Sequence, residues 1–156
     1  MIERLLKVRI KDEDGEKYDR NIRLAYNPDD PFVVELDVQP AAGVDGCHHP
    51  WAVDRDMLWQ AVSVGVGAAP IGDGDIKMAA TPQRLLVFLY GSGDEDGRVA
   101  TLYLDRPAVR RFLLAVREAV PPGEEHRFYS IDDVIARLLG QPRQVWQQIE
   151  EPGAGE

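Results

Sequence analysis

The chain has 156 residues, of which 44% are hydrophobic and 29% charged, and its formal net charge is -9 at pH 7. This length suits one compact domain whose core needs no disulfide or metal. The acidic balance argues against binding nucleic acid by phosphate neutralisation, and against attraction to an anionic membrane surface. With Cys47 as the only cysteine, no intrachain disulfide is possible. The N-terminus lacks a signal-peptide run and no stretch is apolar enough to span a bilayer, so we expect a cytoplasmic protein without membrane insertion.

The first half of the sequence predicts antiparallel strands. Apolar and polar side chains alternate over residues 5–10, 21–26 and 32–38, with turns at 12–15 and 27–31 between them. Alternation with a period of two is typical of half-buried strands joined by short turns. A loop over 39–50 then leads to a short strand at 51–53.

A helix and a second set of strands are predicted next. Asp54 fits the N-cap of a helix that begins at Arg55 and has an apolar side that includes Leu58 and Val62. After a loop over 67–75, strands are expected near 76–80, at 84–90 and at 98–104. The last two form a hairpin, and the strand at 84–90 lies inside the sheet because it is apolar throughout.

Two helices are predicted at the C-terminal end. After Asp105 the apolar residues recur at the spacing of a helix and form one stripe: Val109, Phe112, Leu113, Val116 and Val120. Pro121 and Pro122 cannot continue that helix. A second helix begins at Ser130, and its stripe consists of Ile131, Val134, Ile135, Leu138 and Leu139. The fold class is therefore α+β, and we expect residues 141–156 to be partly disordered.

No group of residues makes a convincing reactive site. His126 beside Glu124 and Glu125 could form an acid/base pair, but nothing around it supplies a nucleophile, so a solvated turn between helices is favoured. Residues 47–49 with Asp54 and Asp56 could bind a metal, yet neighbouring strand residues point to opposite faces. The glycine- and aspartate-rich segments 12–15, 72–75 and 94–97 lack the spacing of phosphate or calcium loops and are predicted to be turns. No catalytic, cofactor or metal residue is predicted, and an enzyme is not expected.

Several segments, in order and spacing, resemble the SsgA/SsgB-like family of actinobacterial sporulation and cell-division proteins. They are residues 26–38, 51–58, 72–78, 104–126 and 131–139, and the resemblance extends from about Leu5 to Leu139. It implies a single domain over 1–140 with a C-terminal extension over 141–156. It also implies a fold similar to the plant whirly proteins: two antiparallel sheets packed crosswise, an internal helix and two C-terminal helices. The loop at 43–50 and the tail are longer than is typical, which leaves the subtype open.

The resemblance also implies a function. Members are not enzymes. SsgB-type members bind the tubulin-like division GTPase FtsZ and help to place its ring at sporulation septa, and SsgA-type members help to localise the SsgB type. The implied assembly is a homotrimer at the division septum. The single-stranded DNA binding of whirly proteins does not transfer, because the chain is acidic and shows no basic, aromatic-lined track. A whirly-like module that binds single-stranded nucleic acid or a ligand is the alternative function.

Two surfaces are candidates for the partner. The first is the strand-to-helix joint with the helix that follows it, where Trp51, Asp54, Arg55 and Trp59 are expected to be exposed. The second is the arginine side of the 106–118 helix, which would attract an acidic segment and includes Arg110 and Arg111. A solvated helix face for the arginines, and core or rim packing for the tryptophans, are the alternative interpretations.

Overall fold

One curled antiparallel sheet carries the fold in the computed structural model. The structure describes residues 1–41, 50–63, 69–91 and 98–129, and, between 131 and 139, Ile131, Asp132, Ile135, Ala136, Leu138 and Leu139. Within these residues the sheet has eight strands in the order β4-β3-β2-β1-β8-β7-β6-β5. The strands are β1 (Ile2–Asp12), β2 (Lys17–Tyr26), β3 (Val33–Val38), β4 (Trp51–Asp54), β5 (Ile71–Asp73), β6 (Ile76–Ala80), β7 (Arg84–Tyr90) and β8 (Arg98–Asp105).

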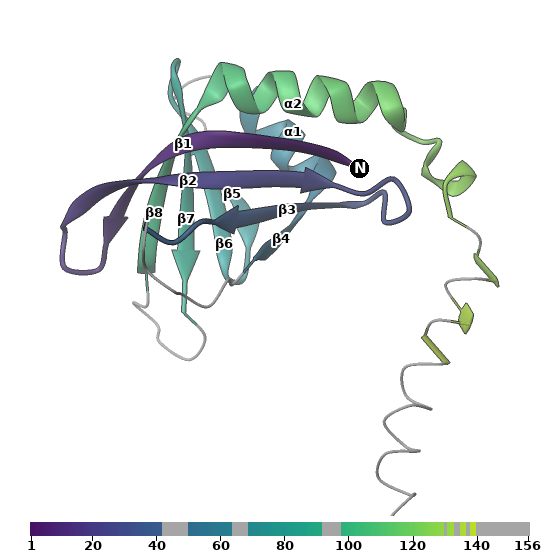
Figure 1. The fold of residues 1–156 in the computed structure, drawn as a ribbon, viewed down its shortest axis with the longest axis horizontal. Helices are drawn as coiled ribbons and strands as arrows, with labels where there is room; N and C mark the ends of the chain where they lie inside the picture. The colour runs from purple at the N-terminus through teal and green to yellow at the C-terminus, as the bar shows by residue number, and fades with distance from the viewer. Residues whose placement is uncertain are drawn as a thin grey trace, which may run out of the picture.

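The two halves of the sheet cross but remain joined. Strands β1–β4 run across the view in Figure 1, and β5–β8 run down it behind them. The C-terminal end of β1 pairs with β8 from Arg9 opposite Tyr103 to Asp12 opposite Ala100. The prediction of two separate sheets is therefore wrong, because β1 is long enough to use both of its edges. One edge of β1 forms backbone hydrogen bonds with β2 along the strand, and the other edge forms them with β8 at the curled end. Backbone N–H and C=O groups of β1 that would otherwise be unpaired are therefore satisfied.

Helix α2 (Arg106–Ala119) covers one end of the crossed sheet. Its predicted apolar stripe is confirmed: Val109, Phe112, Leu113, Val116 and Val120 are all buried. Asp105 caps the helix by accepting a hydrogen bond from the Ala108 N–H (3.0 Å), and a proline follows in the first turn. The helix contacts β1, β7, β8 and α1, so its buried face closes the core between the two halves of the sheet.

Helix α1 (Arg55–Ser63) is the predicted internal helix. Asp54 is its N-cap, because an Asp54 carboxylate oxygen accepts from the Met57 N–H (2.9 Å). Leu58, Ala61 and Val62 are buried. None of the helices in the described part of the chain is long and apolar enough to cross a membrane.

Two differences from the predictions concern loops and the C-terminus. Part of the predicted loop at 67–75 forms strand β5, which turns tightly into β6; at Gly72 (φ +135°) a Cβ atom would lie 2.4 Å from the Ile76 carbonyl oxygen, so only glycine fits. After α2 the chain forms a 3₁₀ turn, η1 (Glu125–Arg127). The described residues between 131 and 139 have helical backbone and are exposed, which leaves the second C-terminal helix a prediction. Residues 43–49, 94–97 and 141–156 lie outside the described part.

Replacing Phe112 by alanine should destabilise the protein strongly. Phe112 is 1% exposed beneath α2, and truncating a buried phenylalanine typically removes about 3–5 kcal/mol from the free energy of unfolding. Leu114→Ala is the matched control on the same helix, because Leu114 is 42% exposed and should change this free energy by no more than about 0.5 kcal/mol. Urea unfolding followed by circular dichroism measures both, and similar losses in the two variants would contradict the packing described for α2.

Candidate partner-binding surface

Arg55, the first residue of α1, is buried. It is 2% exposed, and its guanidinium donates to the Tyr26 hydroxyl (3.1 Å), to the Val120 carbonyl (2.8 Å) and to the carboxylate of Glu125. These partners come from the end of β2, the end of α2 and η1. The prediction that Arg55 lies on an exposed surface is therefore wrong. One feature of the sequence does indicate burial: positions 55, 58 and 62 share one face of a helix, and the other two are core residues.

The same contact corrects the interpretation of residues 124–126. Glu125 is 9% exposed and points to Arg55, so it does not lie in a solvated turn. His126 is exposed and Glu124 pairs with Arg127 (3.4 Å), so the three side chains do not converge on one point. The pKa of Glu125 is lowered, mainly because its carboxylate accepts from its own backbone N–H, with smaller contributions from the Gly123 N–H and Arg55, while burial opposes the shift. Glu125 thus stays ionised and holds the hinge after α2 against α1.

Tyr26 completes this buried network. Its hydroxyl accepts from Arg55 and donates to the Pro31 carbonyl (2.9 Å), which ties the turn after β2 to α1. Burial raises the pKa of Tyr26, and the nearby Arg55 charge partly offsets that rise. Every polar group in the network therefore has a partner, as buried charges require.

Polar and aromatic residues on the outer sides of α1 and α2 form one exposed to half-buried surface. Trp59 of α1 is half-buried, and its ring lies 4.1 Å from the guanidinium carbon of Arg117 and 5.8 Å from that of Arg110. Both distances are within the range of cation–π contacts. We call Arg106, Arg110, Arg111, Arg117 and Trp59 the α2 arginine surface. The two candidate surfaces predicted from the sequence thus meet here, since Trp59 of the first lies against Arg110 of the second.

A hollow of about 440 Å³ opens on the α2 arginine surface. Its lining consists of Val62, Ser63, Pro82, Arg106, Pro107, Arg110 and Arg111. Arg106 is held in place because it donates to the carbonyls of Val62 (2.9 Å) and Thr81 (2.9 Å). The hollow is therefore mainly polar, with guanidinium groups beside the exposed rings of Pro82 and Pro107, a lining that can hold an anionic group next to a small apolar one.

Trp51 and Asp54 do not belong to this surface. Asp54 is exposed, but its carboxylate is occupied in capping α1. Trp51 lies on β4 opposite Leu36 and lines a different hollow, of about 590 Å³, with residues of β1, β2, β7 and β8. Their predicted roles in partner binding remain predictions.

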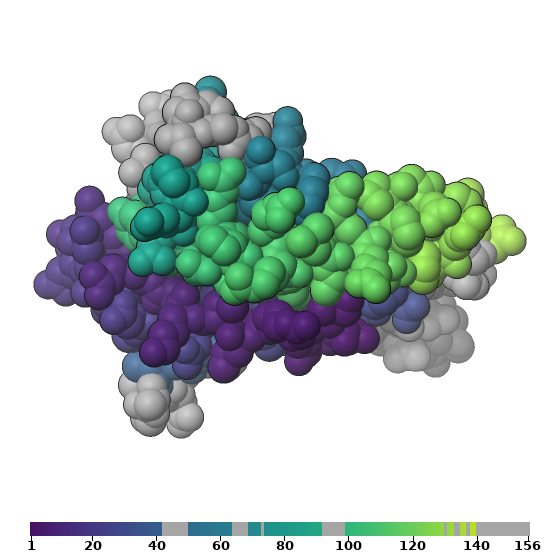
Figure 2. Space-filling view, turned by 90° about the horizontal axis from the view of Figure 1, so that it is seen from above, coloured from purple at the N-terminus to yellow at the C-terminus, as the bar shows by residue number. Residues whose placement is uncertain are grey.

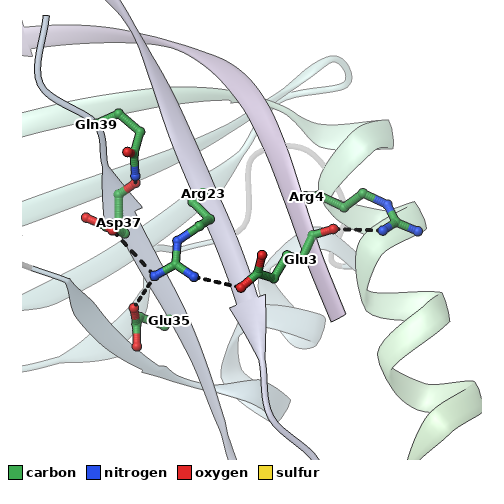
Figure 3. Close-up of polar contacts among 6 residues, drawn as sticks. All are labelled: Glu3, Arg4, Arg23, Glu35, Asp37 and Gln39. Carbon is green, nitrogen blue, oxygen red and sulfur yellow. Dashed lines mark hydrogen bonds and ion pairs between the residues drawn. The ribbon is translucent and has the colours of Figure 1, made fainter. Parts of the chain in front are cut away.

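An ionic cluster on the outer face of the sheet was not predicted. In Figure 3, Arg23 of β2 lies between carboxylates of the neighbouring strands: Glu3 (2.9 Å), Glu35 (2.9 Å) and Asp37 (3.5 Å). The pairing of β1, β2 and β3 brings these residues together, and alternation alone does not reveal such a register. Because three carboxylates already surround it, Arg23 is a link between strands and is poorly suited to attract an acidic partner.

Comparison with known proteins identifies the family. A family model described as the Streptomyces sporulation and cell division protein SsgA matches residues 21–125. The chain belongs to the SsgA family. It is 34% identical to the sporulation-specific cell division protein SsgB of Kineococcus radiotolerans over 119 residues, which are 74% of this chain and 66% of that protein. It therefore spans slightly less than two thirds of that relative. A sporulation-specific cell division protein of Frankia casuarinae is 30% identical over 139 residues, with 89% and 90% of the two chains covered.

Solved structures of SsgA-like proteins have the same fold. One comes from a study that correlates mutations in SsgB with longitudinal cell division during sporulation of Streptomyces coelicolor; its TM-score is 0.65 at 24% identity, over 81% of this chain and 94% of that one. An SsgA-like sporulation-specific cell division protein of Thermobifida fusca gives a TM-score of 0.69 at 20% identity, over 87% and 93%. Membership of the SsgA family indicates a role in cell division during sporulation. The likeness to whirly proteins remains a prediction.

Replacing Arg55 by methionine should destabilise this SsgA-family protein by about 3–5 kcal/mol, because it leaves the buried Glu125 carboxylate without its counter-charge. Arg127→Met is the matched control. It breaks an exposed pair with Glu124, which should be worth at most about 1 kcal/mol. Denaturant unfolding measures both, and an Arg55→Met protein as stable as the control would show that the buried pair does not hold the helices.

Proposed function

We propose that this protein is a non-enzymatic cell-division adaptor that recruits or positions FtsZ at sporulation septa, as the resemblance to SsgB-type proteins implies. The observation that carries the proposal is the family match over residues 21–125, joined to relatives whose names place them in sporulation-specific cell division. The adaptor acts in the cytoplasm at the division septum, and other SsgA-like proteins are among its partners.

A basic face on an acidic protein supports the proposal. The chain as a whole carries a net charge of -9, yet exposed Arg110 and half-buried Arg117 of α2 both lie against Trp59. Aromatic residues and arginines are enriched where proteins bind one another. We propose Trp59, Arg110 and Arg111 as contact residues for the partner.

Self-association would strengthen binding to a polymer. We propose a homotrimer, in which each subunit presents the same surface, so that several weak contacts act together on the repeated subunits of an FtsZ filament. Apolar side chains near the C-terminal end support it, because they are exposed and recur at helical spacing: Ile131 (66%), Ile135 (47%), Leu138 (61%) and Leu139 (62%). Such a stripe is typical of a helix face that another protein surface covers.

Co-sedimentation with FtsZ tests the adaptor function. We expect the purified protein to pellet with FtsZ polymers assembled with GTP and to stay in the supernatant with FtsZ kept unassembled in GDP. The reason is avidity, because only the polymer repeats the epitope. If this protein has a confirmed trimeric mass but stays in the supernatant at every concentration of FtsZ polymer, the proposal is overturned.

Replacing Leu138 and Leu139 together by glutamate should dissociate the trimer. Charges on the apolar stripe would have to be buried between subunits without partners, so sedimentation velocity should shift from trimeric to monomeric mass. Ala136→Glu is the control, because Ala136 is exposed but lies off the stripe. A double variant that keeps the oligomeric mass of the unmodified protein would exclude this stripe as the contact between subunits.

A further inference from the structure

We propose that the α2 arginine surface binds an acidic segment of a partner protein, with carboxylates held by Arg110 and Arg111 and one apolar side chain in the hollow beside them. This inference rests on the adaptor function proposed above, because it specifies the chemistry of the segment that the adaptor recognises. The occupant is a peptide rich in aspartate and glutamate that carries a leucine or a residue of similar size.

Arg110 and Arg111 differ from the arginines that link elements elsewhere in the described chain. Arg9, Arg23 and Arg55 each have a carboxylate within ion-pair distance. Within the described residues, no carboxylate lies that close to Arg110 or Arg111, and both are exposed. Their positive charge is therefore not compensated locally, although the protein as a whole is acidic. Figure 2 shows α2 lying along the surface between β1 and α1, where a partner can reach it.

A second basic hollow offers a comparison. It lies on the outer face of the sheet, has a volume of about 400 Å³, and is lined by Lys7, Val8, Arg9, Lys17, Asp19, Arg84 and Tyr103. There, however, Arg9 pairs with Asp19 (3.0 Å) and Arg84 approaches Asp105 (3.9 Å). Two of its cations are thus already matched by carboxylates. The charge available to an acidic partner is greater on α2.

The α2 arginine surface is also organised before a partner arrives. Trp59 lies against Arg110 and Arg117, and Arg106 is held by two backbone carbonyls. A guanidinium that is already ordered loses less conformational entropy when it binds a carboxylate, and its planar fork can hold both oxygens at once. The contact with the Trp59 ring therefore favours carboxylate binding at Arg110.

The hollow accounts for the apolar part of the segment. Its exposed apolar residues are Pro82 and Pro107, and its volume of about 440 Å³ accommodates a single aliphatic side chain with its backbone. A nucleic acid fits less well, since single strands need a longer basic track with exposed aromatic rings on which bases stack. The net charge of -9 would also repel a long polyanion.

The test is direct binding of a defined probe. A short fluorescein-labelled peptide of glutamates and aspartates with a central leucine is titrated with the full chain. Two control probes are titrated in the same way: the same peptide with glutamine and asparagine in place of the acidic residues, and labelled oligothymidylate. We expect only the acidic peptide to bind, and its affinity to fall as salt is raised. The variant Arg110→Glu with Arg111→Glu should bind it at least about tenfold more weakly. Lys7→Glu with Lys17→Glu, which makes the same change in net charge in the other basic hollow, should bind like the unmodified chain.

Each other outcome overturns the inference. An equal loss in both double variants would show that net charge alone governs binding, and unchanged affinity in the arginine variant would exclude this surface. Preference for oligothymidylate, abolished in the arginine variant, would assign the surface to nucleic acid. Because all four substituted residues are exposed, unchanged unfolding midpoints are expected and serve as the folding control.

Co-sedimentation with FtsZ polymers then separates the inference from the proposed function. If the unmodified chain and the arginine variant pellet equally, the adaptor function stands and the assignment to α2 is wrong. If the acidic peptide binds through the arginines but the unmodified chain does not pellet with polymers, the peptide site stands and the FtsZ partner is wrong.

Discussion

A buried guanidinium organises the helical side of this protein. Arg55 lies where the end of β2, the start of α1 and the hinge after α2 meet, and it contacts all three through Tyr26, Val120 and Glu125. A charge removed from water in this way is tolerated only when its hydrogen-bond donors and its counter-charge are matched. Because Arg55 belongs to α1 and its partners include Val120 and Glu125 after α2, the contact holds α1 in place relative to the end of α2. The position of Trp59 against the α2 arginines follows from that placement.

The curled sheet provides the frame in which this contact forms. Strand β1 bonds β2 on one side and β8 on the other, so the crossed halves share one continuous ladder. The crossing leaves a core between the halves that α2 closes with its apolar stripe. A helix fixed across the end of the sheet must present its opposite side to solvent, and on α2 that side carries the arginines.

Charge is arranged differently on the outer face of the sheet and on α2. On the outer face of the sheet, Arg23 is surrounded by carboxylates from the neighbouring strands and links those strands (Figure 3). On α2, Arg110 and Arg117 lie against the ring of Trp59, and within the described residues no carboxylate is within ion-pair distance of Arg110 or Arg111. Arginines that are already paired with carboxylates on a sheet surface attract an anionic partner only weakly, whereas arginines without a carboxylate nearby attract anionic groups. This contrast, and not the net charge, is the reason for proposing α2 as the partner surface.

The amino-acid sequence by itself determined the elements and the family. Alternation marked most of the strands, the spacing of Val109, Phe112, Leu113 and Val116 marked α2, and Asp54 marked the start of α1, because each of these is a local property of the chain. Only the tertiary structure decided that the sheet is continuous, that Arg55 meets Glu125, and that Trp59 lies against Arg110 and Arg117. These features depend on pairs of residues far apart in the chain. Glu125 lies 70 positions after Arg55, and nothing local to either residue shows that a buried counter-charge will meet it.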